Sequence, residues 1–325
     1  MFMINVAIVM GGYSGEHQVS LKSGQLIFDS IDTEKFNPIK VIISVDGWFA
    51  KDEEGIYPIN KADFSFEKER AKINFDVAFN IIHGTPGEDG YMQAYWDLIG
   101  LPYTGCGHYL SALTFNKKDT LAVLNKYNIQ SAKSVYLSLE EEYNITEIVE
   151  KVGLPCFVKP NQSGSSLGIS KVKTKEELVP AFEKAFQEDD DILIESFLDG
   201  TEVSVGVIQY KGQTIVPGIT EIVSHNEFFD FDAKYNGSSE EITPARIDDE
   251  TAEKVRNTAI KVYNSLRMNG MSRSEFIIQN GIPYLLEMNT LPGFSPASIL
   301  PQQLNYAGIS IKDFVTSEIE KAISL

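Results

Sequence analysis

The chain has 325 residues, of which 43% are hydrophobic, and it carries a formal net charge of -18. This length allows two or three domains with cores of their own, and the acidic balance argues against nucleic acid as a partner, because phosphate binding needs a basic face. The sequence has two cysteines, and it shows neither an apolar run of membrane-spanning length nor a signal-peptide pattern at its start. These features predict a cytoplasmic globular protein with no membrane partner.

The first segment predicts a strand, a glycine-rich loop and a helix. An apolar run at residues 5–10 leads into Gly11-Gly12-Tyr13-Ser14-Gly15-Glu16-His17, and the apolar pattern from 19 to 27 is helical. The loop lacks the G-x-G-x-x-G spacing of a dinucleotide site. It nevertheless brings Glu16 to the carboxyl end of a strand, where open α/β sheets bind ligands.

Two further strands, at 39–45 and 75–82, and a helix at 91–99 continue the α/β alternation and predict a small open sheet. The strand at 75–82 runs into a polar loop, His83-Gly84-Thr85-Pro86-Gly87-Glu88-Asp89-Gly90, at the same sheet edge as Glu16. His83 is therefore either a ligand contact or an ordinary loop histidine.

The middle of the chain predicts two helices within 108–127 and then a hairpin. A strand at 156–160, a small-residue loop at 161–168 and a strand at 169–172 differ from a P-loop, whose glycine-rich turn opens a helix. The sequence has no G-x-x-x-x-G-K-[ST] motif, which excludes Walker-type ATPases. A helix at 175–187 follows.

The next strand, starting at 192, passes into a connector at residues 195–202, where Asp199-Gly200 is a candidate hinge. A long hairpin is predicted at 203–210 and 214–223, turning at Lys211-Gly212. The aromatic stretch at 228–237 has no regular pattern, and a long loop of this kind is usually functional. A helix at 250–268 shows an apolar stripe that indicates core packing.

The last predicted hairpin joins strands at 272–278 and 282–289 through Asn280-Gly281. Glu287 and Asn289 share one face, and their oxygens suit Mg²⁺, although a solvated edge strand would show the same pattern. With a simple two-residue turn, Glu275 would pair with Leu286 on the wrong face. A shared metal site therefore requires an odd-length loop or a β-bulge.

Six motifs in this order resemble the D-alanine:D-alanine ligases of the ATP-grasp superfamily over nearly the full length. They are G-G-x-S-x-E-H-x-V-S-L-x-S-G from Gly11, H-G-x-x-G-E-D-G from His83, F-V-K-P with its G-S-S loop from Phe157, the connector from Glu195, Ala233-Lys234-Tyr235, and L-E-x-N-T-x-P-G-F from Leu286. The resemblance implies an α/β protein, α+β in the ATP-binding part, with an ATP-grasp fold and an N-terminal open-sheet domain.

Three domains are implied by this resemblance. An N-terminal α/β domain at 1–105 would hold the first D-alanine, and a central ATP-grasp domain would span 106–199. A C-terminal ATP-grasp domain at 200–325 would carry the metal and acceptor sites.

The resemblance also implies residues for ATP and for two Mg²⁺ ions, with Mn²⁺ able to substitute. The implied ATP contacts are Lys117, Lys159, Glu195, Ser196, Phe197, Leu198, Glu202 and Lys234. The implied metal ligands are Glu275, Glu287 and Asn289, and the family usually has aspartate at the position of Glu275.

Substrate and catalytic residues follow from the same motifs. Glu16 would pair with the ammonium of the first D-alanine, with His83 nearby, and Glu16, Ser165 and Tyr235 would close the site. Arg273 and the backbone N–H of Gly293 would stabilise the oxyanion. Ser298 and the backbone near Ile299 would receive the carboxylate of the second substrate.

The implied reaction joins two D-alanine molecules through a D-alanyl phosphate, for peptidoglycan precursor synthesis, in a homodimer. Tyr235 favours the dipeptide product, since D-alanine:D-lactate ligases commonly have histidine in this loop. The alternatives are another carboxylate–amine ligase, such as a D-alanine:D-lactate or D-alanine:D-serine ligase, and a nucleotide-binding sensor without catalysis. Cys106 and Cys156 are expected to pack as small hydrophobic residues.

Overall fold

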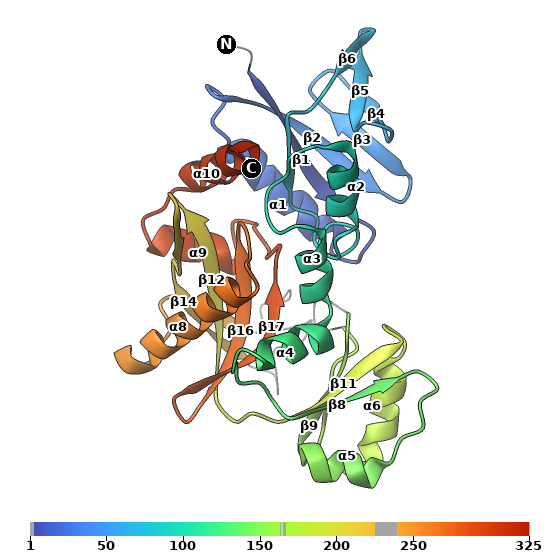
Figure 1. The fold of residues 1–325 in the computed structure, drawn as a ribbon, viewed down its shortest axis with the longest axis vertical. Helices are drawn as coiled ribbons and strands as arrows, with labels where there is room; N and C mark the ends of the chain where they lie inside the picture. The colour runs from blue at the N-terminus through green and yellow to red at the C-terminus, as the bar shows by residue number, and fades with distance from the viewer. Residues whose placement is uncertain (1–2, 163, 165–166, 225–238, 325) are drawn as a thin grey trace.

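The structure is a computed structural model that describes residues 3–324, except 163, 165–166 and 225–238. Its three sheets follow one another along the long axis of the molecule (Figure 1). The first sheet lies at the top, the third sheet in the middle and the second sheet at the bottom. Each sheet is built from one continuous part of the sequence, at 4–80, 134–196 and 201–289.

The first sheet has the strand order β6-β5-β4-β3-β2-β1-β7. β1 (Ile4–Gly11) pairs in parallel with both β2 (Phe36–Ser44) and β7 (Val77–Asn80), so the loops that follow β1 and β7 leave the same edge. This confirms that Glu16 and His83 follow neighbouring strand ends. Helices α1 (His17–Ser30) and α2 (Tyr91–Ile99) complete this part.

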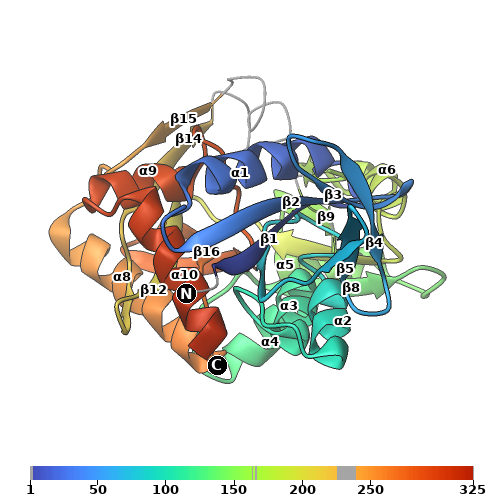
Figure 2. The same ribbon diagram turned by 90° about the horizontal axis from the view of Figure 1, so that it is seen from above.

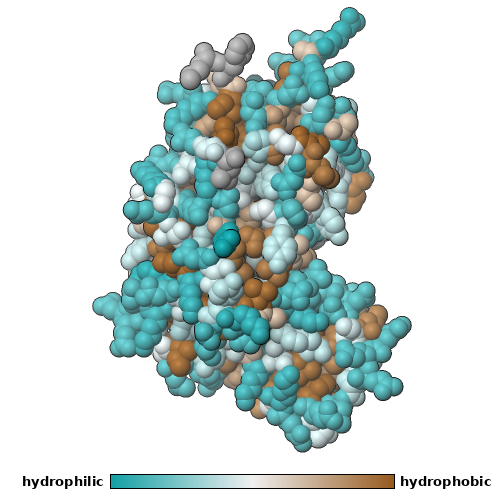
Figure 3. All heavy atoms as spheres, in the orientation of Figure 1, coloured by the Kyte–Doolittle hydropathy of each residue, from teal (hydrophilic) through white to brown (hydrophobic). Residues whose placement is uncertain are grey.

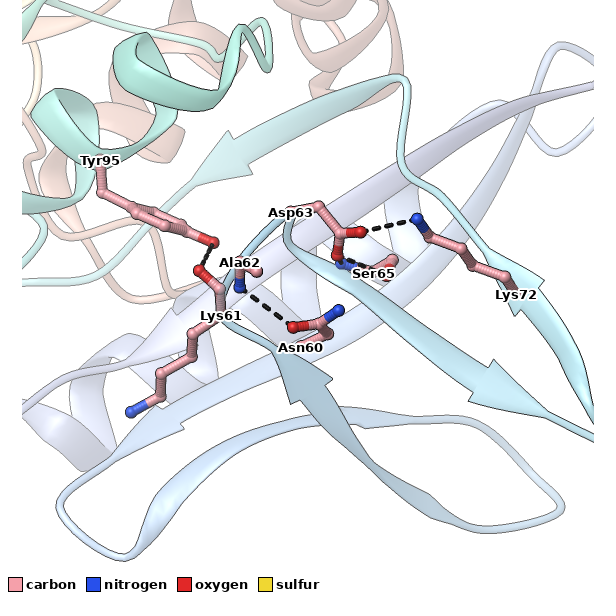
Figure 4. Close-up of polar contacts among 7 residues, drawn as sticks. All are labelled: Asn60, Lys61, Ala62, Asp63, Ser65, Lys72 and Tyr95. Carbon is pink, nitrogen blue, oxygen red and sulfur yellow. Dashed lines mark hydrogen bonds and ion pairs between the residues drawn. The ribbon is translucent and has the colours of Figure 1, made fainter.

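An antiparallel meander between β2 and β7 was not predicted from the sequence. It consists of β3 (Gly47–Lys51), β4 (Ile56–Asn60), β5 (Ser65–Lys68) and β6 (Ala71–Ile73). Figure 4 shows the turn between β4 and β5, where Asp63 accepts a 2.6 Å bond from Lys72. The Tyr95 hydroxyl donates to the Lys61 carbonyl at 3.0 Å and so ties the meander to α2.

The second sheet has the order β10-β9-β11-β8 and is antiparallel at every pairing described. Its strands and helices are β8 (Ser134–Ser138), α5 (Ile145–Val152), β9 (Cys156–Pro160), β10 (Ser170–Val172), η1 (Lys175–Glu177), α6 (Leu178–Ala185) and β11 (Asp191–Ser196). Helices α3 (His108–Phe115) and α4 (Lys117–Asn125) precede it and match the two predicted helical patterns. The predicted helix at 175–187 is a 3-10 turn followed by a shorter α-helix.

The third sheet has the order β15-β14-β12-β16-β17, with β13 paired to β12. Its strands are β12 (Thr201–Tyr210), β13 (Gln213–Ile215), β14 (Ile219–Ser224), β15 (Ser239–Ile242), β16 (Ser272–Gln279) and β17 (Ile282–Asn289). The predicted arm at 214–223 is thus two strands. α8 (Asp249–Ser265) buries the predicted apolar stripe, including Val255, Ala259 and Val262, against this sheet.

The C-terminal helices pack between the first and third sheets, with α9 against β12 and β14 and α10 against β7, β12 and α1. α9 (Ile299–Tyr306) and α10 (Ile311–Ser324) contribute Leu300 and Phe314 to a core that also contains Ile8 and Phe79. Phe294 stacks on Phe314 in this core with ring centroids 5.6 Å apart. Figures 1 and 2 both place α10 beside α1. The segment that follows β17 is therefore held against the N-terminal part of the chain.

Hydrophilic residues cover most of the face drawn in Figure 3, with small apolar patches between them. This agrees with the acidic composition. Within the part of the chain that the structure describes, no helix is long and apolar enough to span a membrane.

Candidate active site

The hairpin of β16 and β17 contains a β-bulge, one of the two alternatives that the sequence left open. Gln279 pairs with Ile282 across Asn280-Gly281, both of which have positive φ (53° and 72°), so the turn has two residues. The register then shifts beyond the pair of Phe276 and Leu285, and Glu275 pairs with Glu287. Leu286 is the extra residue of the bulge. Glu275, Glu287 and Asn289 therefore lie along one face of the hairpin.

Two cavities lie beside this hairpin. One of about 470 Å³ lies between the second and third sheets, and one of about 350 Å³ lies between the third sheet and the loops of the first. Arg273 and Glu287 line both cavities, while Glu275 lines the first and Asn289 the second. The two spaces therefore meet at the polar face of β16 and β17.

The first cavity, here called the inter-sheet cavity, contains most of the residues implied for ATP. Its lining includes Lys159, Glu195, Ser196, Phe197, Leu198 and Glu202. Lys159 Nζ lies 2.6 Å from Glu195 Oε2, and both residues are buried. Burial lowers the pKa of the Lys159 ammonium, but the charges of Glu195 and Glu287 outweigh burial and hold the pKa above its ordinary value. Lys159 is therefore a fixed positive charge on the cavity wall.

Arg273 and Glu275 form a second ion pair at the meeting point of the two cavities, with side chains 19% and 11% exposed. Arg273 Nε lies 2.6 Å from Glu275 Oε1, which also accepts a 3.2 Å bond from the Ser204 hydroxyl. Burial lowers the pKa of the Arg273 guanidinium, and Glu275 with other nearby carboxylates more than restores it. Arg273 stays charged, and its pairing orients the carboxylate of Glu275.

The second cavity, here called the loop cavity, collects the residues implied for amino-acid substrates. Its lining includes Glu16, His83, Gly293, Ser298 and Ile299. Lys117 also lines it, rather than the inter-sheet cavity, and Lys117 Nζ lies 3.4 Å from Glu287 Oε2. A side chain at Gly164 would collide with the carboxylate of Glu16, so the hairpin after β9 closely approaches the N-terminal loop.

Gly293 and Ser298 shape one wall of the loop cavity. A Cβ atom at position 293 would lie 3.1 Å from Ser298 Oγ, so a side chain there would crowd this wall. Ser298 Oγ accepts a 3.0 Å bond from the Ser295 N–H and lies 2.9 Å from Ser295 Oγ. Ser298 immediately precedes α9, and the N-terminal end of a helix favours a negatively charged group.

Three implied site residues, Ser165, Lys234 and Tyr235, lie outside the described residues. Three charged residues of the loop cavity were not among the predicted site residues, namely Lys22, Glu88 and Glu241. Glu88 belongs to the polar loop after β7, and its place in that loop could have identified it as a site residue. No sequence pattern identifies Lys22 or Glu241 as a site residue, because they reach the cavity only through the packing of α1 and β15.

Glu88 is a buried carboxyl group whose pKa is about 8. Burial raises the pKa most, the negative charge of Glu16 raises it further, and a 3.0 Å bond from the Gly84 N–H lowers it. The folded state therefore holds this proton more tightly than the unfolded state. The stabilising effect is complete below the unfolded pKa and is lost as the pH rises from about 5 to about 8.

Glu88→Gln should remove this pH dependence, because glutamine resembles the protonated acid. We expect the free energy of unfolding of the variant, minus that of the wild type, to increase across the same pH window. Urea unfolding at several pH values measures it, with the exposed Glu150→Gln as the matched control. If the difference in unfolding free energy between Glu88→Gln and the wild type does not change with pH, Glu88 does not have a raised pKa.

The two cysteines carry no reactive thiol. Cys106 and Cys156 are both free and buried, and burial raises the pKa of each thiol to about 11. Both pack in the core, as the sequence predicted.

Comparisons with known proteins agree with this architecture. Family models described as D-ala D-ala ligase N-terminus and D-ala D-ala ligase C-terminus match residues 5–106 and 118–320. The chain is 58% identical to a D-alanine--D-alanine ligase from Flavobacterium psychrophilum, over 99% of this chain and 98% of that protein.

Solved structures match over the same extent. The VanG D-Ala:D-Ser ligase from Enterococcus faecalis has a TM-score of 0.86 at 29% identity, covering 99% of this chain and 100% of that one. A D-alanine--D-alanine ligase from Bacillus anthracis complexed with ATP has a TM-score of 0.79 at 28% identity, covering 99% and 98%.

The fold and the two joined cavities define the chain as an ATP-grasp enzyme. The chain belongs to the D-alanine–D-alanine ligase family, since both family models and a relative with more than half of its residues identical match nearly its whole length. The resemblance found in the sequence motifs is thereby confirmed.

Proposed function

We propose that this enzyme joins two D-alanine molecules in two steps within the joined cavities. The γ-phosphoryl group of ATP is transferred to the carboxylate of the first D-alanine, which gives D-alanyl phosphate and ADP. The amine of the second D-alanine attacks the acyl carbon, and phosphate leaves. The observation that carries this proposal is that Arg273 and Glu287 line both cavities, so a phosphoryl donor and an amino acid can meet there.

The inter-sheet cavity is proposed to hold ATP. Glu195, Ser196, Phe197 and Leu198 line this cavity and would contact the adenine base, and Glu202, which also lines it, would contact the ribose hydroxyls. Lys159 would neutralise phosphate oxygens, and Lys117, at the meeting point of the cavities, would face the transferred phosphoryl group. Lys234 is proposed to assist from the long loop.

Glu275, Glu287 and Asn289 are proposed to hold two Mg²⁺ ions, with Mn²⁺ able to substitute. The bulge sets the three side chains on one face, and their oxygens form a donor set suited to a hard cation. When bound, Mg²⁺ would neutralise charge on the phosphates. The chain itself supplies Lys117 and Arg273 beside Glu287 and Glu275, which limits repulsion between the two carboxylates.

The loop cavity is proposed to hold both D-alanine molecules. Glu16 would bind the ammonium of the first, with His83 on the same wall, and Ser298 with the backbone near Ile299 would bind the carboxylate of the second. Arg273 and the Gly293 N–H would stabilise the tetrahedral oxyanion. Glu16, Ser165 and Tyr235 would close the site and exclude water from the acyl phosphate.

The substrate pair can be tested by measuring ADP formation and identifying the product. We expect D-alanine to stimulate ATP turnover and to give D-alanyl-D-alanine. D-lactate or D-serine as the second substrate should be much slower at neutral pH. Comparable rates with either would favour the D-alanine:D-lactate or D-alanine:D-serine alternative, and no D-alanine-dependent turnover in folded protein would favour a sensor.

Several further proposals rest on family membership. They are the domain ranges 1–105, 106–199 and 200–325, a homodimer, a cytoplasmic location and a role in peptidoglycan precursor synthesis. The sheets at 4–80, 134–196 and 201–289 support the ranges, although α9 and α10 share their core with the first sheet.

A further inference from the structure

A chain of buried hydrogen bonds joins three distant segments beside the loop cavity. The Phe294 N–H donates to Ser23 Oγ at 3.0 Å, Ser23 Oγ lies 2.9 Å from His83 Nε2, and His83 Nδ1 lies 2.9 Å from the Leu291 carbonyl oxygen. Ser23 is on α1, and His83 follows β7. Ser23, His83, Leu291 and Phe294 are all buried.

The chemistry of these groups fixes the direction of each hydrogen bond. The Leu291 carbonyl can only accept, so the proton of His83 is on Nδ1. In the neutral ring Nε2 then accepts, and the Ser23 hydroxyl must be its donor. Ser23 Oγ in turn accepts from the Phe294 N–H. A charged ring would carry a proton on Nε2 and leave the Ser23 proton without this acceptor.

The burial of His83 favours the same neutral form. Burial lowers the pKa of the ring most, and the positive charge of Arg273 also lowers it, while Glu16 and the bond to Leu291 oppose this. Both ring nitrogens are thus engaged with protein atoms. His83 can contact a ligand through the face or edge of its ring, but both of its nitrogens are hydrogen-bonded to other parts of the protein.

The series of hydrogen bonds ends at two backbone groups, one before and one after Gly293 in the sequence. The Leu291 carbonyl and the Phe294 N–H lie on either side of Pro292-Gly293, and Phe294 is anchored in the core against Phe314. We propose that Ser23, acting through His83 and Phe294, is a positioning residue that fixes the Gly293 N–H for catalysis. This inference rests on the proposed function of Gly293 as an oxyanion donor.

Ser23→Ala tests the inference, and Ser20→Ala is its matched control. Ser20 is also fully buried on α1, and its hydroxyl also makes two hydrogen bonds, accepting from the Gly11 N–H at 2.8 Å and donating to the Ile81 carbonyl at 2.7 Å. Neither bond touches the segment from Leu291 to Phe294. The two variants should therefore lose similar stability but differ in catalysis.

We expect Ser23→Ala to lower kcat for D-alanyl-D-alanine formation by about tenfold, less than the 100-fold or greater loss typical of deleting an oxyanion donor. The KM for ATP should stay unchanged, because Ser23 does not line the inter-sheet cavity. Ser23→Cys, which keeps a weak donor, should fall between the alanine variant and the wild type. A kcat for Ser23→Ala like that of the wild type, or an equal loss in Ser20→Ala, would overturn the proposal.

Nitrogen NMR of ¹⁵N-histidine protein gives a readout that a general loss of stability would not change. Wild-type His83 should show a neutral ring with its proton on Nδ1, and its Nε2 signal should shift in Ser23→Ala but not in Ser20→Ala. A charged ring or a proton on Nε2 at about pH 7 would refute the hydrogen-bond chain. A wild type that makes no dipeptide would instead refute the proposed function, while the NMR result would still test the chain.

Discussion

Arg273→Ala is expected to lower kcat for D-alanyl-D-alanine formation by more than about 100-fold. Arg273 is a cation that lines both cavities, and its side chain is 19% exposed. Its loss removes a proposed oxyanion donor and also leaves the carboxylate of Glu275 without the 2.6 Å ion pair that orients it. Steady-state ADP release, with folding checked by circular dichroism, measures the effect.

Two companion variants make this result specific. Arg273→Lys keeps a positive charge but loses the planar guanidinium, so we expect it to recover only part of the activity. Arg256→Ala removes an exposed helix arginine that pairs with Glu253 at 2.8 Å, and it should leave kcat unchanged. If folded Arg273→Ala keeps a kcat within about tenfold of the wild type, Arg273 is not an oxyanion donor.

Lys159→Met is expected to have the second large effect, on both stability and ATP binding. Lys159 and Glu195 form a buried pair at 2.6 Å, with side chains 9% and 5% exposed. Removing one partner of such a pair leaves an uncompensated buried charge, which typically costs about 3–5 kcal/mol. Urea unfolding without nucleotide should show a loss of this order, and ATP affinity should also fall, because a phosphate-neutralising charge is gone.

A double variant separates these two roles of Lys159. Lys159→Met combined with Glu195→Gln removes both charges, so most of the free energy of unfolding should return. ATP affinity should stay weak, because the cation is still missing from the inter-sheet cavity. If the double variant regains the affinity of the wild type for ATP, Lys159 acts only within the fold and does not bind phosphate.

The last hairpin shows how far sequence reasoning reaches. Asn280-Gly281 predicted the turn from local preferences, and the alternation of side chains then required either an odd-length loop or a β-bulge. Arg273 and Glu275 are two residues apart on one strand, so they share a face by strand geometry alone. The pairing of the two strands and the need for a register shift could therefore be predicted before the structure was known, while metal binding at this face stays a prediction.

Residues brought together by long-range packing could not be predicted in this way. The partner of His83 Nδ1 is 208 residues away, and the Phe294 N–H that reaches Ser23 is 271 residues away. The meander was missed because its strands are short and show little alternation, as in Ala71–Ile73, where two of three residues are exposed. The local pattern of apolar and polar residues carries no information on contacts between residues that are far apart in the sequence.

The central claim is that D-alanine becomes phosphorylated where the two cavities meet, before the second amino acid attacks. Turnover with D-alanine labelled with ¹⁸O in its carboxylate tests this claim most directly, by mass spectrometry of the released phosphate. We predict that each phosphate carries one ¹⁸O atom, because the bridging oxygen of D-alanyl phosphate leaves with phosphorus when the amine attacks carbon. Phosphate without ¹⁸O, released alongside labelled D-alanyl-D-alanine, would contradict the account.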